Sequence, residues 1–237
     1  MKTNALCGYL RLLPVAGMMI LCTCSGDGYQ PVFDGKSLAD WEYDPVYWRV
    51  ENDCMVGEVT PSTILSRNTF IIRKDLVLKD FELKVEYRIS ENGNSGVSYR
   101  NERVEDVPYA LKGYQADIDG KNQYTGQNYE ERGRQFLALR GQTGVIDSLY
   151  RSPSHQAVSE IDFRNDPLNR HIRENDWNEY HIIAKGNRLQ HFINGMLMSD
   201  VTDNDATNRR LSGLLGVQVH VGPPMKVEFR NFMVKSL

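Results

Sequence analysis

Residues 81–89 alternate without exception between apolar and charged side chains, and this period of two limits the fold more than any other feature of the chain. The apolar members are Phe81, Leu83, Val85, Tyr87 and Ile89, and the charged members are Glu82, Lys84, Glu86 and Arg88. Successive side chains point to opposite faces of a β-strand, whereas a helix would scatter these residues around its axis. The segment is therefore predicted to be a strand with one face in a core and the other in water.

Shorter segments that resemble strands recur along the chain, and turn residues separate them. They cover residues 47–57, 70–73, 97–100, 113–120, 136–140, 177–186, 188–198, 215–221 and 226–234. The Asn194-Gly195 pair lies between apolar residues, which predicts a β-hairpin, and a second hairpin is expected with its tip at residues 51–53. A tight turn is expected at residues 91–96. One short helix is expected at residues 157–163, within an irregular insertion at residues 141–176 near the mouth of a site.

Many short strands without a sustained, capped helix predict an antiparallel β-sandwich. A chain of 237 residues, 41% of them hydrophobic, is long enough for one such domain with a real core. The sequence has no P-loop and no GxGxxG, HExxH or GxSxG motif, which argues against nucleotide, zinc-protease and serine-hydrolase chemistry. The formal charge of −3, without a basic cluster, argues against nucleic acid as a partner.

The N-terminal segment is predicted to lie outside the folded domain. Lys2 and Arg11 accompany an apolar run that is too short for a permanent membrane span. The run ends in Leu21-Cys22-Thr23-Cys24, which resembles the lipobox of bacterial lipoproteins. The alternative is an ordinary secretory signal with incidental cysteines. The expected organisation is a lipoprotein signal peptide at 1–23, a lipidated Cys24 with a tether at 24–31, and one domain at 32–237.

This organisation predicts export and attachment to a bacterial membrane only through the lipid, on the periplasmic or the cell-surface side. Removal of the signal peptide also removes two basic residues and lowers the formal charge from −3 to −5. Cys7 and Cys22 would leave with the signal peptide, so that Cys54 has no partner for an internal disulfide. A lone cysteine of this kind is usually buried as a small hydrophobic residue.

A row of polar side chains within residues 113–120 is the first candidate for a functional site. Gln115, Asp117 and Asp119 share one face of the predicted strand, opposite Tyr114, Ala116 and Ile118. The strand at 215–221 repeats the pattern, because Gln218 and His220 lie opposite its valines. If both strands line one concave sheet, their polar groups converge on one ligand. The alternative is two unrelated faces in contact with solvent.

Three further residues are candidates with competing structural interpretations. Arg100 is expected on the same sheet face as Ser98, where it either meets a ligand or pairs with a neighbouring acid. Tyr129 belongs to a Gly-, Tyr- and charge-rich segment expected at the rim of the polar strand. His191 shares a face with apolar residues, and a histidine in that setting is usually a hydrogen-bonded core residue.

A series of motifs carries a resemblance to a known family. They are residues 33–38 with Trp41, 93–97 with Arg100, 113–118, 177–178, 191–195, 218–220 and 229–232. In this order, from Val32 to Leu237, the chain resembles the 3-keto-disaccharide hydrolase domain family. The resemblance implies a concanavalin A-like or laminin G-like jelly roll of two curved antiparallel sheets. It also implies a carbohydrate substrate whose sugar carries a ketone at C3, and an exported bacterial protein, often a lipoprotein of a carbohydrate-utilisation system.

One position departs from the family. Many members carry Glu after the Gly-Tyr pair, where this chain has Gln115, with Asp117 two residues further on. The departure leaves two options open: either Asp117 has taken over an acid–base role, or the subgroup with this sequence acts on another substrate.

The implied chemistry assigns roles to the candidates. A ketone at C3 acidifies the proton on C2, so that a base can remove it and the group at C1 can leave with help from an acid. The roles expected are Asp117 or His191 as base, His220 as acid, and Arg100 or Gln218 near the developing oxyanion. The residues expected to hold the sugar are Arg100, Tyr114, Gln115, Tyr129 and Gln218.

This chemistry requires no cofactor, although a divalent metal ion could replace Arg100 as the electrophile. The ligands would then be Asp117, Asp119, His191 and His220. The main alternative function is a non-catalytic carbohydrate-binding lipoprotein of a glycan-utilisation system, since this fold also serves lectins. A third is a structural partner in a glycan-uptake complex. The sequence does not specify the sugar, the aglycone, the choice between elimination and hydrolysis, or the oligomeric state.

Overall fold

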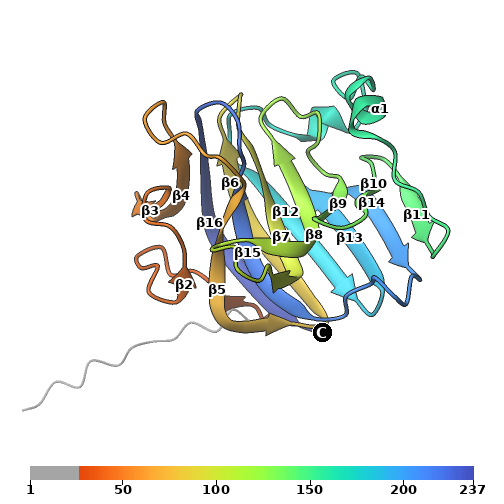
Figure 1. The fold of residues 1–237 in the computed structure, drawn as a ribbon, viewed down its shortest axis with the longest axis horizontal. Coiled ribbons are helices and arrows are strands. Elements are labelled where there is room, and N and C mark those ends of the chain that lie inside the picture. Colours follow the sequence, from red (N-terminus) through yellow and green to blue (C-terminus); the bar gives the residue numbers. More distant parts are fainter. Residues whose placement is uncertain (1–26) are drawn as a thin grey trace, which may run out of the picture.

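The computed structural model describes residues 27–237, which form two β-sheets packed face to face (Figure 1). The predicted signal peptide and Cys24 lie outside the described residues. Sheet A contains β1 (Gln30–Pro31), β3 (Trp48–Glu51), β4 (Cys54–Val59), β6 (Phe81–Ile89), β11 (Thr143–Ile146), β12 (Asn178–Lys185), β13 (Arg188–Ile193), β14 (Met196–Asp203) and β16 (Met225–Ser236). Sheet B contains β2 (Trp41–Glu42), β5 (Thr69–Leu78), β7 (Asn94–Arg103), β8 (Leu111–Asp119), β9 (Asn128–Glu131), β10 (Gln135–Ala138) and β15 (Gly213–Val219).

The order of strands in each sheet is that of a jelly roll. Sheet A runs β11-β14-β13-β12-β6-β16-β4-β3, with β1 on β16, and sheet B runs β10-β9-β8-β7-β15-β5-β2. The described pairs are antiparallel except for β11 with β14. The last two strands of the chain are inserted between earlier ones, β15 between β7 and β5 and β16 between β6 and β4. The expected fold class, an all-β sandwich of two antiparallel-rich sheets, is confirmed.

The core lies between the sheets and follows the alternation seen in the sequence. The apolar residues of β6 are buried, whereas the charged ones are partly exposed, as the alternating pattern predicts. Full burial of one large apolar side chain contributes roughly 1.5–3 kcal/mol relative to exposure, so that this face alone is a substantial part of the core. Cys54 is free and buried, which confirms its interpretation as a small core residue.

Both predicted hairpins form, and each has left-handed residues at its tip. Asn52 and Asp53 join β3 to β4 with φ of 51° and 59°. Asn194 and Gly195 join β13 to β14 with φ of 50° and 79°. Two consecutive residues with positive φ match the twist of antiparallel strands, which is why Asn-Gly favours this connection.

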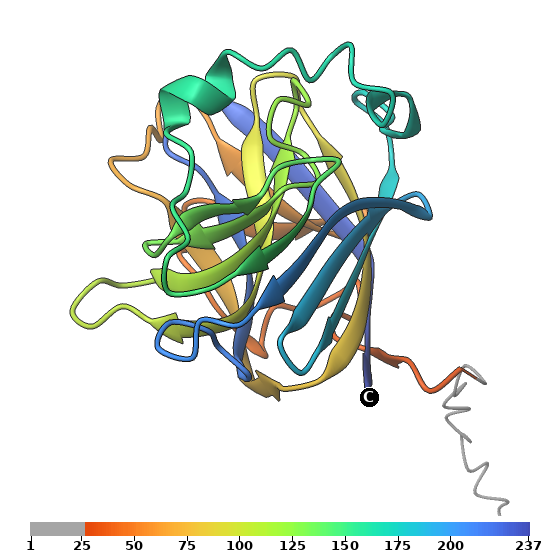
Figure 2. The ribbon, with the colours of Figure 1, turned by 90° about the vertical axis from the view of Figure 1, so that its right-hand side faces the viewer.

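The insertion between β11 and β12 crosses one end of the sandwich (Figure 2). It contains α1 (His155–Ser159) and the short 3₁₀ helix η1 (Asn169–His171). The helix therefore begins two residues before the expected 157–163 and is only one turn long. The side chain of Ser154 accepts a hydrogen bond from the Ala157 backbone, and this cap fixes the start. No helix within residues 27–237 is long and apolar enough to cross a membrane.

Candidate functional site

A cavity of about 370 Å³ opens on the outer face of sheet B, under the segment that carries α1. Its walls combine carboxyl, imidazole and carboxamide groups with aromatic rings. The lining residues are Asn68, Asn94, Gln115, Asp117, Tyr124, Tyr129, Glu131, Phe136, His155, Gln218 and His220. The cavity thus gathers residues from β7, β8, β9, β10 and α1, and from the ends of β5 and β15.

The polar rows of β8 and β15 meet because only β7 separates these two strands. Gln115 lies opposite Ser98 and Asp117 lies opposite Gly96 in the pairing of β8 with β7. Gly96 leaves the space over β7 open, and the Gln115 side chain fills it. A Cβ atom at Gly96 would lie 2.6 Å from the Gln115 carboxamide.

Hydrogen bonds connect these side chains into one row across three strands. Ser98 Oγ donates to Gln115 Oε1 at 3.1 Å. Gln115 Nε2 donates to Asp117 Oδ1 at 3.1 Å and to Gln218 Oε1 at 3.3 Å. Nε2 of Gln218 faces the Glu131 carboxyl without a hydrogen bond of normal geometry, which leaves it available as a donor. Gln115, Asp117 and Gln218 line the cavity and form its floor, and Ser98 lies buried beneath them.

Burial changes the acidity of both carboxyl groups in the cavity. Desolvation raises the pKa of Asp117 well above its usual range, and the Gln115 hydrogen bond only partly offsets this. The nearby Glu131 and Asp119 carboxylates raise the pKa of Asp117 further. Burial also raises the pKa of Glu131, whose environment includes the Asn68 and Gln218 amides. Burial therefore favours the protonated form of Asp117 in this site.

His220 has the opposite tendency. Desolvation lowers the pKa of its imidazole, and nearby His155 lowers it further. Nδ1 donates a hydrogen bond to the Val221 carbonyl at 2.5 Å, which assigns the proton of the neutral ring to Nδ1. Nε2 of His220 then keeps a free lone pair. The cavity consequently brings together a carboxyl group and an imidazole whose neutral forms are both favoured by burial.

Aromatic rings line the side of the cavity toward β9 and β10, next to the polar floor. The Phe136 ring packs at 5.2 Å from that of Tyr129, at 6.3 Å from that of Tyr124, and at 4.8 Å from the His155 imidazole. The Asp119 carboxylate accepts hydrogen bonds from the backbone of Lys121, Gln123 and Tyr124 and so shapes the loop that presents Tyr124. Such a wall suits the apolar face of a sugar ring or another flat group.

Arg100 does not belong to the cavity, contrary to expectation. A bulge interrupts the pairing of β7 with β8 between Tyr99 and Glu102, and Arg100 adopts a φ of 51°. The residue therefore leaves the face of Ser98. Its buried guanidinium donates to the carbonyl groups of Lys79, Gly186 and Arg210 and to Asp80, so that it ties turns together at one end of the sandwich.

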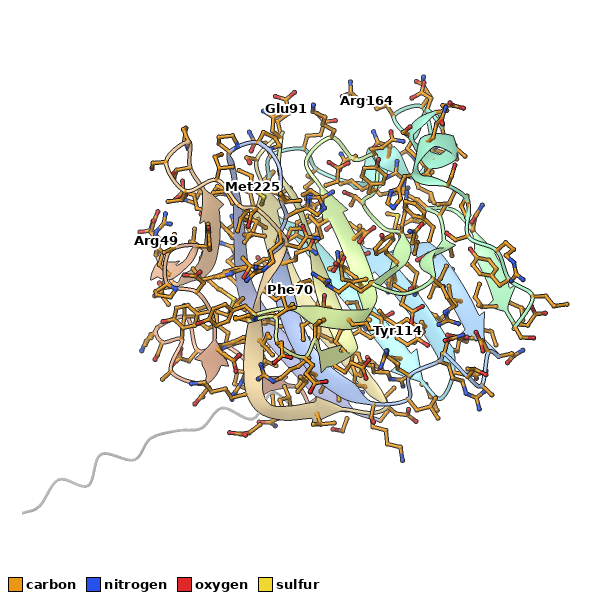
Figure 3. The ribbon with its side chains drawn as sticks, viewed as in Figure 1. Arg49, Phe70, Glu91, Tyr114, Arg164 and Met225 are labelled. Carbon is orange, nitrogen blue, oxygen red and sulfur yellow. The ribbon has the colours of Figure 1, made fainter. Side chains whose placement is uncertain are left out.

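Tyr114 and His191 also lie outside the cavity, because their faces point between the sheets. Tyr114 donates from its hydroxyl to Asp203 at 2.5 Å, and Figure 3 shows it in the half of the molecule away from Arg164 and the α1 segment. His191 is fully buried and hydrogen-bonded to the Tyr99 hydroxyl and the Gln127 carbonyl. The metal-ligand set proposed from the sequence is therefore not assembled, and no group of three or more potential metal ligands occurs within residues 27–237.

Of the expected site residues, the structure brings Gln115, Asp117, Tyr129, Gln218 and His220 together. It adds residues that the sequence interpretation missed, namely Asn68, Asn94, Tyr124, Glu131, Phe136 and His155. Glu131 could have been predicted from the sequence, because it lies two residues after Tyr129 and therefore on the same strand face. His155 could not, since only the path of the insertion brings it over sheet B.

Comparison with known proteins assigns this chain to a family. A family model described as the 3-keto-alpha-glucoside-1,2-lyase-like domain matches residues 28–235. A curated 3-keto-disaccharide hydrolase from Bacteroides thetaiotaomicron is 30% identical over 89 residues, a match that covers 33% of this chain and 29% of that protein.

Solved structures share the fold. A candidate glycosyl hydrolase from Parabacteroides distasonis superposes with a TM-score of 0.57 at 20% identity, over 89% of this chain and 94% of the other. A carbohydrate-binding module from Bacillus subtilis superposes with a TM-score of 0.54 at 17% identity, over 88% of this chain and 96% of the other. At these identities the likeness concerns the fold.

Proposed function

Because the chain belongs to the 3-keto-alpha-glucoside-1,2-lyase-like domain family, and is in that sense a carbohydrate-active protein, we propose that it cleaves glycosides whose sugar carries a ketone at C3. The observation that carries this proposal is the pairing of Asp117 and His220 in one cavity. Burial favours the protonated form of the first and the neutral form of the second. A neutral acid and a neutral base in one cavity suit elimination next to a ketone, which needs a base for the proton on C2 and an acid for the leaving group.

In the proposed reaction, Nε2 of His220 removes the proton from C2 of the sugar, and the electron pair forms an enolate with the C3 oxygen. The enolate then collapses to the ketone as a C1–C2 double bond forms and the C1–oxygen bond breaks. Asp117 gives its proton to the departing oxygen. These roles differ from the expectation from the sequence, which made Asp117 or His191 the base and His220 the acid.

Addition of water to the C1–C2 double bond would complete a hydrolysis. The oxygen of the water molecule bonds to C1 while the Asp117 carboxylate takes a proton from that water. The His220 imidazolium returns a proton to C2. Both groups regain their starting state. The negative charge on the C3 oxygen requires a donor, and we assign this role to Nε2 of Gln218, because it is buried and without a normal hydrogen bond.

The first test measures how the folded domain, residues 27–237, cleaves two matched substrates. The 3-keto form of an aryl glucoside should be cleaved and the unoxidised glucoside should not, because only the ketone acidifies the C2 proton. His220→Gln should lower turnover by on the order of 100-fold or more. Equal cleavage of both substrates, or none of either, would contradict the proposal. Binding of both glucosides without cleavage would instead support a carbohydrate-binding protein, which the aromatic wall would suit.

The acid role has its own test, which uses the leaving group. Asp117→Asn cannot protonate the departing oxygen, so its rate should fall by on the order of 100-fold for an alkyl leaving group. A nitrophenolate leaves without a proton, so its release should fall much less. The ratio of the two rates in wild type and variant is the measurement. An equal loss for both leaving groups would remove Asp117 from the acid role.

We further propose that the protein is an exported lipoprotein, lipidated at Cys24. The support is the sequence Leu21-Cys22-Thr23-Cys24 after a short apolar run. Cells that express the full chain and receive radiolabelled palmitate should incorporate label into the wild-type protein. They should not label Cys24→Ser, whereas Cys54→Ser should label normally, because Cys54 is buried in the domain. Label that persists in Cys24→Ser would rule out this anchor.

A further inference from the structure

The Gln115 carboxamide has little hydrogen-bonding capacity left for a ligand. Its Oε1 accepts from Ser98, and its Nε2 donates to Asp117 and Gln218. The side chain is 3% exposed although it lines the cavity. A buried amide committed at both ends is better suited to orient its neighbours than to bind a sugar.

We propose that Gln115 is a positioning residue, which holds Oδ1 of Asp117 as a hydrogen-bond acceptor and so directs the acidic proton of Asp117 to Oδ2. This inference rests on the proposed function, in which Asp117 is the acid. It assigns Gln115 a role different from the sugar binding expected from the sequence.

The orientation of the Gln115 amide follows from its neighbours. Nε2 of Gln218 faces the Glu131 carboxyl, so Oε1 of Gln218 must point the other way, toward Gln115. An acceptor there requires the Nε2 end of Gln115. The same Nε2 therefore donates to Oδ1 of Asp117, while Ser98 donates to the Oε1 end. Ser98 and Gln218 thus fix the orientation of the Gln115 amide and, through it, the hydrogen bond to Asp117 on β8.

The protonation of Asp117 agrees with the charges around it. The groups that face it include Glu131 from β9, Asp119 from its own strand and Tyr129 from the cavity wall. His220 follows β15, and the lowered pKa of its imidazole favours the uncharged form. The surrounding carboxylates and burial favour a neutral Asp117. With Oδ1 held by Gln115, the only oxygen of a neutral Asp117 that can carry the proton is Oδ2.

The spectroscopic test does not depend on turnover. A protonated carboxyl group has a carbonyl-stretching infrared band, and the difference between wild type and Asp117→Asn isolates the band of Asp117. In Gln115→Met the carbonyl oxygen Oδ1 loses its hydrogen-bond donor, so we expect the band at higher frequency. The matched control is Gln190→Met, which removes an equivalent Gln-to-Asp hydrogen bond to Asp200 on sheet A and should leave the band unchanged. An unshifted band in Gln115→Met would overturn the inference.

A second variant keeps the size of the side chain. In Gln115→Glu two carboxyl groups stand about as close as the present 3.1 Å contact, and such a pair shares one proton. The proton then lies between the two groups instead of on Oδ2. We expect kcat to fall on the order of 100-fold with KM within about threefold of wild type. A raised KM with unchanged kcat would overturn the inference, because it would show that Gln115 binds the sugar.

The two readouts separate this inference from the proposed function. If no 3-keto-glucoside is cleaved but the Asp117 band shifts in Gln115→Met, the positioning role stands and the proposed reaction fails. If 3-keto-glucosides are cleaved and Gln115→Met and Gln115→Glu match wild type in both band and kcat, the reaction stands and the positioning role fails.

Discussion

Two histidines show how the environment of a residue, more than its type, decides its role. His191 lies between the sheets, fully buried among tyrosine rings, and its two nitrogens are used by Tyr99 and Gln127. His220 lies in the cavity with one nitrogen committed to a backbone carbonyl. Burial lowers the pKa of both. Only His220 combines a neutral ring with access to a ligand.

The buried position of His191 predicts a pH dependence of stability. Desolvation lowers its pKa from 6.5 to about 3 in the folded protein. Below pH 6.5 the unfolded chain binds a proton that the folded protein does not bind, so acid favours unfolding. This group alone should lower the free energy of unfolding by roughly 1.4 kcal/mol per pH unit between pH 6 and pH 4. Urea unfolding of wild type and His191→Gln across this range measures the effect.

His191→Gln removes the titrating group while a side chain with a donor and an acceptor remains. The variant should be less stable than wild type at pH 7.5, and its stability should fall less steeply as the pH is lowered. His171→Gln is the control for the loss of an imidazole outside the core, because His171 lies in η1 at the surface and is partly exposed. Parallel slopes for wild type and His191→Gln would show that His191 takes up its proton in the folded state.

Sequence reasoning succeeded at this scale wherever alternation held. It placed Tyr114 and His191 on apolar faces and Gln115, Asp117, Gln218 and His220 on polar faces, as the structure has them. It failed for Arg100 because a bulge adds a residue to one strand and shifts Arg100 off the face of Ser98. Nothing in the local sequence distinguishes that strand from a regular one.

At the scale of elements, the floor of the cavity depends on a strand position without a side chain. The sequence predicts a tight turn at residues 91–96, but β7 begins at Asn94 and Gly96 lies within it. A glycine beside Asn and Ser is typical of a turn, so the sequence pattern alone could not indicate its real use. Its use is tertiary, because Gln115 from β8 crosses over it to reach β15.

Gly96→Ala should therefore displace the Gln115 side chain from the floor of the cavity. The new methyl group would lie 2.6 Å from the Gln115 carboxamide, so Gln115 must leave the floor or the strands must separate. We expect a loss of about 1–3 kcal/mol in unfolding free energy and a clear loss of turnover. Denaturant unfolding and kinetic assays measure the two effects. Gly144→Ala on β11 is the control, because nothing lies within 4 Å of its Cβ position, and it should behave as wild type.

The α1 segment depends on one buried arginine. Arg140 donates to the Asp166 carboxylate and to the carbonyl groups of Asn122, Thr125 and Phe163. It thereby joins the Tyr124 loop to the insertion that carries His155. The sequence indicated only that the insertion lies near the site, since these partners lie 15 to 26 residues away along the chain.

Arg140→Met should loosen both segments while the sheets persist, because the arginine bonds to loops and not to strand backbone. Amide hydrogen exchange should speed up in residues 119–126 and 147–172 and stay slow in β6. KM for the proposed substrate should rise more than kcat falls, since the aromatic wall is displaced. Arg188→Met is the control, because Arg188 also pairs with an aspartate but is 57% exposed. Unchanged exchange in the two loops of Arg140→Met would contradict the assignment of Arg140 as their anchor.

At the scale of the whole molecule, the order of strands could not be deduced from the order of segments. Alternation and turn residues predicted most of the longer strands, and both hairpins pair as neighbours in the chain do. The two final strands instead enter the middle of sheets made by earlier segments. Their central position follows from pairing on both sides, β15 with β7 and β5, β16 with β6 and β4. Such long-range pairing leaves no local signal.

The central place of β16 predicts that the two ends of the described chain differ in their importance for folding. Deletion of residues 225–237 would remove the strand between β6 and β4, leave both with unpaired edges, and expose core residues such as Val227, Phe229 and Phe232. Unpaired edges and exposed apolar residues favour aggregation, so this truncated domain should be unfolded by circular dichroism or insoluble. Deletion of residues 27–31 removes β1, which pairs with one edge of β16 over two exposed residues, and Tyr29, whose hydroxyl donates to Glu82 on β6. That domain should stay folded, with the same cavity and turnover as residues 27–237. A soluble, cooperatively folded product of the first deletion would contradict this prediction, because it would mean that β6 and β4 can close the sheet without β16. The core would then depend less on β16 than the burial of the β16 side chains indicates.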